Sequence, residues 1–166
     1  MVSVSASLLL LAAAMAVILP AGEGFPDGAP IEACILPNPN RPNHPATKSQ
    51  PPSSSKHSFT ASASHYRPGD VITVIISGPP FKGYFVQARD SITHDWIGSF
   101  DETRDTKSYP ECSAATHNTV PPKSSVKLVW HAPRDSSGTV YFTGTILERY
   151  DRYWSDVVAK VIKPRF

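Results

Sequence analysis

Long apolar segments are scarce in this chain of 166 residues, and none is long enough to be a membrane-spanning helix. The longest, Leu8 to Leu19, holds 12 apolar residues, whereas a helix needs about 20 to cross a bilayer. A run of this kind near the N-terminus is typical of a secretory signal peptide, and Gly22 and Gly24 provide small residues for cleavage. We therefore expect residues 1–24 to be a signal peptide, residues 25–166 to form one domain, and that domain to have no membrane span.

The sequence also lacks the short motifs of catalytic and metal sites. Its six histidines form no H-x-H, H-x₃-H or H-E-x-x-H pattern, which a local metal site would use. Its serines form no G-x-S-x-G elbow. Asp101 and Glu102 are adjacent carboxylates, but they lie in a turn-like stretch and are expected to be solvated. These absences predict a protein that is not an enzyme and holds no metal or other cofactor.

Charge is present in small amounts and in near balance. The formal net charge is +2, and removal of Glu23 with the signal peptide changes it to +3. No run of consecutive basic residues occurs, so nucleic acid is not an expected partner. A mildly basic chain can still be attracted to anionic surfaces.

Cysteine is nearly absent, with only Cys34 and Cys112. In an oxidising compartment the two can pair with each other or with another molecule. An intramolecular bridge would close a long loop, which stabilises a fold by about 4 kcal/mol in the chain-entropy description. We favour this bridge; two free thiols are one alternative, and a zinc site without a C-x-x-C motif is a weaker one.

Proline, by contrast, is abundant: six of the 17 prolines lie between Pro37 and Lys56, together with a run of serines. This segment has no apolar periodicity, so it is predicted to be an extended loop or loosely held coil.

From Phe59 onward, the sequence has the pattern of an all-β protein. Leu128 and Trp130 alternate with Lys127 and His131, as expected of a strand with one buried face. Turn residues recur about every ten positions, which indicates a sandwich or barrel. The predicted strands are Phe59–Ala63, Val71–Ser77, Phe85–Arg89, Trp96–Phe100, Ala114–Asn118, Val126–Trp130, Thr139–Leu147 and Val157–Ile162.

These patterns predict an immunoglobulin-like β-sandwich of about eight strands with one disulfide, and a small barrel is the alternative. The turn Asp135 to Gly138 is expected to join two strands as a hairpin. Trp96 and Trp130 lie in strand patterns and are expected in the core.

Several segments, taken in order, resemble the reeler domain family. They are Phe25 to Pro30 followed by Cys34, Tyr66 to Asp70, Phe81 to Arg89, Ile97 to Phe100, Cys112, Thr116-His117, Val129 to Pro133, and Tyr153-Trp154. Together they cover nearly the whole chain after residue 24.

A reeler domain alone resembles the insect defence proteins of the noduler-like group. This resemblance implies an immunoglobulin-like sandwich with a disulfide, secreted into the haemolymph, with an immune function. The implied partners are bacterial surface glycolipids or polysaccharides such as lipopolysaccharide, and haemocytes, whose aggregation into nodules such proteins promote; antimicrobial action is also implied. The alternative is an extracellular adhesion or matrix-interaction module without a microbial ligand.

The best candidate for a ligand site is an aromatic and basic cluster near the C-terminus: Arg149, Arg152, Tyr153 and Trp154. A guanidinium matches phosphate or carboxylate, and aromatic faces can stack on sugar rings. In the alternative interpretation, Tyr153 and Trp154 fill the edge of the core and the arginines solubilise a loop. Lys160, Lys163 and Arg165 would extend the patch only if the last strand lay beside this loop.

Overall fold

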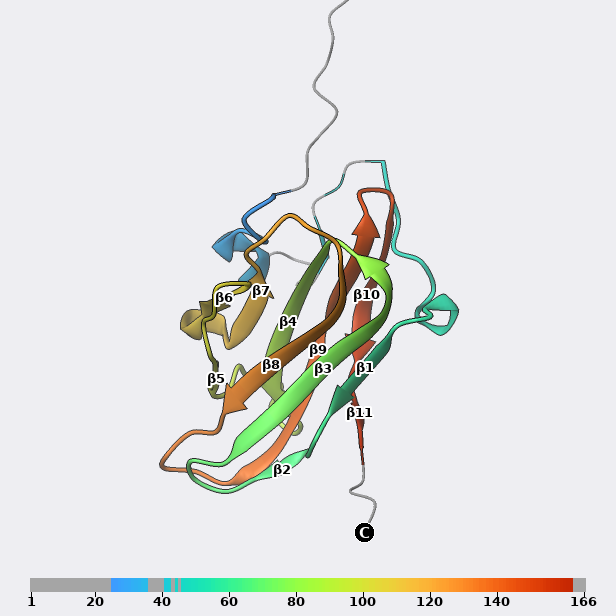
Figure 1. Ribbon diagram of the computed structural model, residues 1–166. Helices are drawn as coiled ribbons and strands as arrows, with labels where there is room; N and C mark the ends of the chain where they lie inside the picture. The colour runs from blue at the N-terminus through green and yellow to red at the C-terminus, as the bar shows by residue number, and fades with distance from the viewer. Residues whose placement is uncertain (1–24, 36–40, 43, 45, 163–166) are drawn as a thin grey trace, which may run out of the picture.

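Two β-sheets packed face to face form the body of the protein (Figure 1). The computed structural model describes residues 25–35, 41–42, 44 and 46–162, so the predicted signal peptide lies outside the described residues. The first sheet has the strand order β11 (Lys160–Val161), β1 (Ser58–Ala61), β3 (Val71–Phe81), β8 (Lys123–His131) and β5 (Ser99–Phe100). Within the described residues, no helix is long and apolar enough to span a bilayer.

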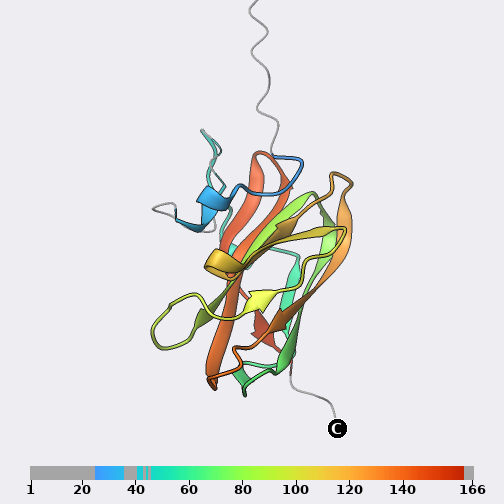
Figure 2. The same ribbon diagram turned by 90° about the vertical axis from the view of Figure 1, so that its left-hand side faces the viewer.

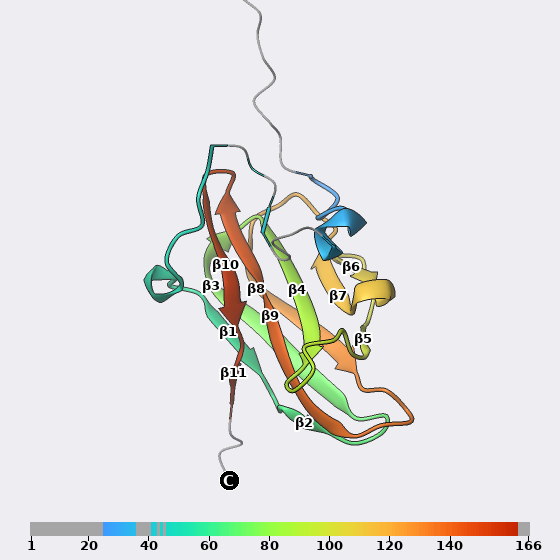
Figure 3. The same ribbon diagram turned by 180° about the vertical axis from the view of Figure 1, so that it is seen from behind.

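The second sheet lies behind the first and is seen directly in Figure 3. Its order is β10 (Arg152–Val158), β9 (Gly138–Arg149), β4 (Gly83–Asp90), β7 (Ala114–His117) and β6 (Thr106–Tyr109), while the short β2 (His65–Tyr66) pairs with β9. Three short 3₁₀ helices complete the description: η1 (Ile31–Cys34), η2 (Pro52–Ser54) and η3 (Pro110–Cys112). The prediction of an all-β sandwich is thereby confirmed.

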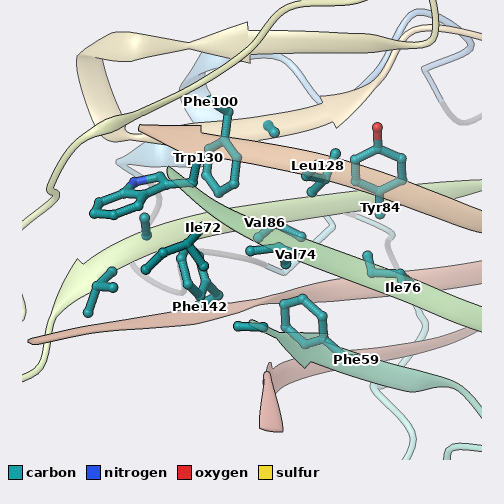
Figure 4. Packing of buried hydrophobic residues seen from close by; sticks show 14 of the residues in the cluster. Phe59, Ile72, Val74, Ile76, Tyr84, Val86, Phe100, Leu128, Trp130 and Phe142 are labelled. Atoms are coloured by element: carbon teal, nitrogen blue, oxygen red, sulfur yellow. The ribbon is translucent and has the colours of Figure 1, made fainter. Parts of the chain in front are cut away.

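The main core fills the space between the sheets (Figure 4). Residues of β3 alternate between buried and partly exposed from Val71 to Ser77, because successive side chains of a strand point to opposite faces. Ile72, Val74 and Trp130 of the first sheet meet Phe142 of the second, and all four are at most 1% exposed. The β-branched run after the turn at Gly69 therefore forms a central strand of the sandwich.

A smaller apolar cluster lies on the outer face of the second sheet, beneath η1. The disulfide between Cys34 and Cys112 is buried there, against Phe85 and Tyr109. Tyr109 donates its hydroxyl to the carbonyl of Ala29 at 2.7 Å. The predicted bridge is present, and it fastens the N-terminal arm to the sheet.

Three predictions from the sequence are corrected by the fold. The turn at residues 135–138 is not a hairpin, because β8 already pairs with β3 and β5 and the chain crosses to β9 in the other sheet. Trp96 is 41% exposed and is not part of the core, whereas Trp130 is fully buried.

The strand count also differs, with eleven strands among the described residues against about eight predicted. The pattern missed β2 and β6, and it placed the start of β10 five residues too late, at Val157. β2 holds two residues, which is too short for a period of two to be recognised, and the predicted strand Val157–Ile162 covers the end of β10 together with β11.

Candidate functional site

The predicted arginines meet at the hairpin between β9 and β10. Arg149 and Arg152 are directly paired across this hairpin, which forms one end of the sandwich in Figure 1. Each has a carboxylate partner: Arg149 Nε lies 2.6 Å from Asp151 Oδ1, and Arg152 Nε lies 3.0 Å from Glu148 Oε2. The hydrogen bond from Arg149 lowers the pKa of the Asp151 carboxyl. Both arginine side chains remain more than 40% exposed.

The two aromatic residues of the predicted site are buried. Tyr153 and Trp154 are 4% and 2% exposed, so neither presents a free ring face to a sugar. Trp154 donates its indole N–H to Ser54 Oγ at 2.9 Å, and the Arg152 guanidinium lies 5.5 Å from its ring. The interpretation in which both rings fill the edge of the core fits this burial, while ligand binding by the arginines stays a prediction.

The proline- and serine-rich segment explains this burial. It lies along the outer edge of β10, where Gln50 N–H donates to the carbonyl of Tyr153 and Ser155 N–H donates to Ser49 Oγ, both at 2.8 Å. An edge strand has unpaired backbone groups that another segment can satisfy. Of the two alternatives predicted for this segment, residues 47–55 fit the extended loop, interrupted by η2, and not the loosely held coil, because they cover this edge.

The last basic residues do not enlarge the hairpin site. Lys160 lies in β11 and pairs with Thr60 in the first sheet, away from the turn at Asp151 (Figure 1). Lys163 and Arg165 lie outside the described residues.

Sequence reasoning missed a pocket at the opposite end of the sandwich. It has a volume of about 390 Å³ and is lined by Gly69, Gly98, Ser99, His131, Ala132, Pro133 and Arg134. At its side, His131 Nε2 lies 2.8 Å from Asp101 Oδ1, so Asp101 is a hydrogen-bond partner of His131 as well as a solvated turn residue. His131 and Asp101 stand 30 positions apart in the sequence, and no local motif indicated that they meet.

A second missed feature is the loop between β4 and β5, which projects from the body in Figure 2. Ile92 on this loop is 82% exposed. Asp90 Oδ1 accepts hydrogen bonds from the backbone N–H groups of Ile92 and Thr93, and Arg89 donates to the carbonyl of His94. The loop is thus an ordered turn carrying an exposed apolar residue.

Two partly buried histidines make stability depend on pH. Burial lowers the pKa of His44, which stacks on Tyr150, and of His117 on β7, where nearby Lys123 lowers it further. Both groups start from an unfolded-state value of 6.5. As the pH falls below this value, the unfolded chain binds protons more readily than the folded one, and the free energy of unfolding decreases.

We therefore expect a lower Tm at pH 5 than at pH 7 in thermal unfolding followed by circular dichroism. His117→Gln should reduce the difference between the two values. A Tm that is equal at both pH values, or a difference unchanged in the variant, would contradict this assignment.

No group of three or more His, Cys, Asp or Glu residues within the described ranges is arranged to hold a metal ion.

The comparisons with known proteins identify the module. The family model described as "Reeler domain" matches residues 33–166. The chain belongs to the reeler domain family. Two crystal structures of the human F-spondin reeler domain agree in fold, with TM-scores of 0.54 and 0.52 at 20% and 19% identity. They cover 72% and 66% of this chain, and 94% and 90% of the F-spondin chains.

Two kinds of curated protein share this reeler domain. Ferric-chelate reductase 1 of Bos taurus is 33% identical over 120 residues, which are 68% of this chain and 20% of the reductase. The chain thus spans about a fifth of that relative's length. "Putative defense protein 3" of Antheraea mylitta is 31% identical over 136 residues, which are 78% of this chain and 80% of the moth protein. A second moth defence protein, from Samia ricini, is 30% identical and matched over 93% of its length.

Proposed function

We propose that this reeler-domain protein is a secreted defence protein without enzymatic activity, which binds anionic components of microbial surfaces such as lipopolysaccharide. The observation that carries the proposal is the similarity to the moth defence proteins, which extends over 80% and 93% of their length. The corresponding share of the bovine reductase is 20%.

An extracellular location fits the chemistry of the chain. The buried disulfide between Cys34 and Cys112 is of a kind that persists in oxidising compartments. The signal peptide expected at residues 1–24 would direct the chain to such a compartment. Haemolymph is the compartment that we propose.

The β9–β10 hairpin is the proposed contact with the microbial surface. Arg149 and Arg152 are held on neighbouring strands by pairing in the sheet. Asp151, the carboxylate partner of Arg149, has a side chain that is mostly exposed to solvent. A phosphate that approaches this edge could exchange places with Asp151 as the partner of Arg149, because guanidinium groups bind both anions. The hairpin would then recognise the phosphates of a glycolipid.

Removing both guanidinium groups tests this contact. In a pull-down on lipopolysaccharide, we expect Arg149→Ala/Arg152→Ala to bind about tenfold more weakly than the original protein, since charge-assisted hydrogen bonds are lost. The matched control is Arg104→Ala/Lys127→Ala, which removes the same charge from exposed positions elsewhere. Equal loss in both variants would indicate attraction by net charge alone and would contradict a hairpin site.

A second arm of the experiment separates the defence function from adhesion. Binding of the original protein to whole bacteria should exceed that of an unrelated β-sandwich domain with the same charge. If the protein instead binds haemocytes in the absence of bacteria and shows no enrichment on bacteria or lipopolysaccharide, the defence proposal is wrong and an adhesion module is favoured.

A further inference from the structure

Three segments far apart in the sequence meet at the pocket beside His131. The turn after Arg67 contributes Gly69, the segment before Phe100 contributes Gly98 and Ser99, and the end of β8 contributes His131 to Arg134. Ser99 and His131 are directly paired in the β5–β8 ladder, and Gly69 N–H donates to the carbonyl of Pro133 at 3.1 Å. Backbone pairing therefore holds the walls of the pocket in place without using its side chains.

Gly98 brings the wall of the pocket against the core. Its φ of +67° favours glycine, and a Cβ there would lie 2.4 Å from both the Trp130 ring and the carbonyl oxygen of His131. This close approach is explained by packing. Packing does not explain the polar residues Ser99, His131 and Arg134, which line a space of about 390 Å³.

The polar groups at the pocket form a complementary set. His131 Nε2 is bonded to Asp101 Oδ1, and both side chains are close to half exposed. Within the described residues, Arg134 makes no side-chain hydrogen bond or ion pair, and it is exposed on the loop after β8. The lining residues thus offer the Arg134 cation for an anionic group and the Ser99 hydroxyl, which can donate or accept. The Asp101 carboxylate is not part of the lining; it lies beside it, bonded to His131, and can accept hydrogen bonds from hydroxyl groups.

The combination of Arg134, Asp101 and Ser99 favours a carboxylate over a phosphate as the anionic group of a ligand. A phosphate near neutral pH carries up to two negative charges and would be repelled by the Asp101 carboxylate. A sugar that carries one carboxylate presents a single negative charge for Arg134 and neighbouring hydroxyls for Asp101 and Ser99. Guanidinium and carboxylate also match in geometry, since two parallel N–H···O bonds can form.

We propose that the pocket between β5, β8 and the turn at Gly69 binds a carboxylate-bearing sugar, with Arg134 on the carboxylate and the Asp101–His131 pair and Ser99 on the hydroxyls. The site lies at the opposite end of the sandwich from the β9–β10 hairpin (Figure 1). It goes beyond the proposed function, because it recognises a sugar acid and requires neither lipid nor phosphate.

The experiment is a titration of the purified protein with D-glucuronate, followed by backbone amide chemical shifts in NMR. We expect saturable shifts at Gly69, Gly98 and Ser99, and no comparable change at the hairpin. D-glucose lacks the carboxylate, and glucose 6-phosphate has a phosphate instead. Each should bind at least about tenfold more weakly than D-glucuronate. Absence of saturable shifts, or equal binding of glucose, would overturn the proposal, and stronger binding of glucose 6-phosphate would overturn its carboxylate assignment.

The variants are placed at exposed positions, so that a change in binding is not caused by unfolding of the protein. Arg134→Ala should weaken glucuronate binding about tenfold, while Arg134→Lys, which keeps the charge but not the fork, should fall in between. Arg104→Ala, which removes an exposed guanidinium outside both proposed sites, is the matched control and should bind glucuronate like the original protein. Binding unchanged in Arg134→Ala would overturn the proposal. Since the ligand here has no lipid, failure of this test leaves lipopolysaccharide binding at the hairpin unaffected, and the reverse also holds.

Discussion

Replacing both cysteines, as Cys34→Ala/Cys112→Ala, should lower the free energy of unfolding by about 4 kcal/mol. The two residues are separated by 78 positions. The bridge therefore restricts a large part of the unfolded chain, which raises the free energy of that state. Because a domain of ordinary size has a stability of about 5–15 kcal/mol, this loss should be visible as a large decrease in the midpoint of urea unfolding.

The folded state contributes to the same effect. The bridge joins η1 to η3 over the outer face of the second sheet, where Phe85 and Tyr109 are buried. Without it, the arm is held by weaker contacts such as the hydrogen bond from Tyr109 to Ala29. The original protein treated with a reductant should unfold at the same urea concentration as the variant. A decrease of less than about 1 kcal/mol in both would contradict the stabilising role of the bridge.

Trp130→Ala should destabilise the protein by about 3–5 kcal/mol, the range found when a buried aromatic side chain is removed. Trp130 is fully buried between the sheets. Its ring makes edge-to-face contacts with Tyr66 and Phe142, at centroid distances of 5.5 and 5.7 Å. Its indole N–H donates to the carbonyl of Ile97 at 2.9 Å, so truncation leaves a cavity and removes this hydrogen bond.

Two further variants separate these contributions in the same urea unfolding assay. Trp130→Phe keeps an aromatic ring but cannot donate to Ile97, so an intermediate loss is expected. Trp96→Ala removes the same type of side chain from a position that is 41% exposed, and its effect should be below about 1 kcal/mol. Equal losses at Trp96 and Trp130 would contradict the assignment of the core.

The two tryptophans show that a strand-like sequence pattern does not by itself predict whether a side chain is buried. Both stand in β-like stretches, and both were predicted to be buried. In the structure, Trp130 lies in the middle of a sheet, between β3 and β5. Trp96 lies outside the named strands and forms an isolated bridge to Arg89, and its ring lies 6.0 Å from the Arg89 guanidinium. A period of two identifies alternate faces of a strand but does not say whether a strand is flanked on both sides.

The candidate sites illustrate the same limit. Arg149 and Arg152 are three residues apart, so their proximity followed from the local sequence. Burial of Trp154 depended on Ser54, a hundred positions away, in a segment without apolar periodicity. The pocket at His131 is formed by segments that begin near Gly69 and Gly98, and nothing in those segments indicates which strands will be neighbours.

The sequence by itself determined the all-β class, the central strands and the family, because alternation, turn residues and the order of short motifs are properties of neighbouring positions. Pairing of the two cysteines could also be anticipated, since few alternatives exist for two. Only the tertiary structure decided that β8 and β9 belong to different sheets, that the proline-rich segment covers β10, and that His131, Asp101 and Arg134 gather at one end. These features depend on which edges and faces remain free after the sheets have formed, and that is decided by contacts between distant residues.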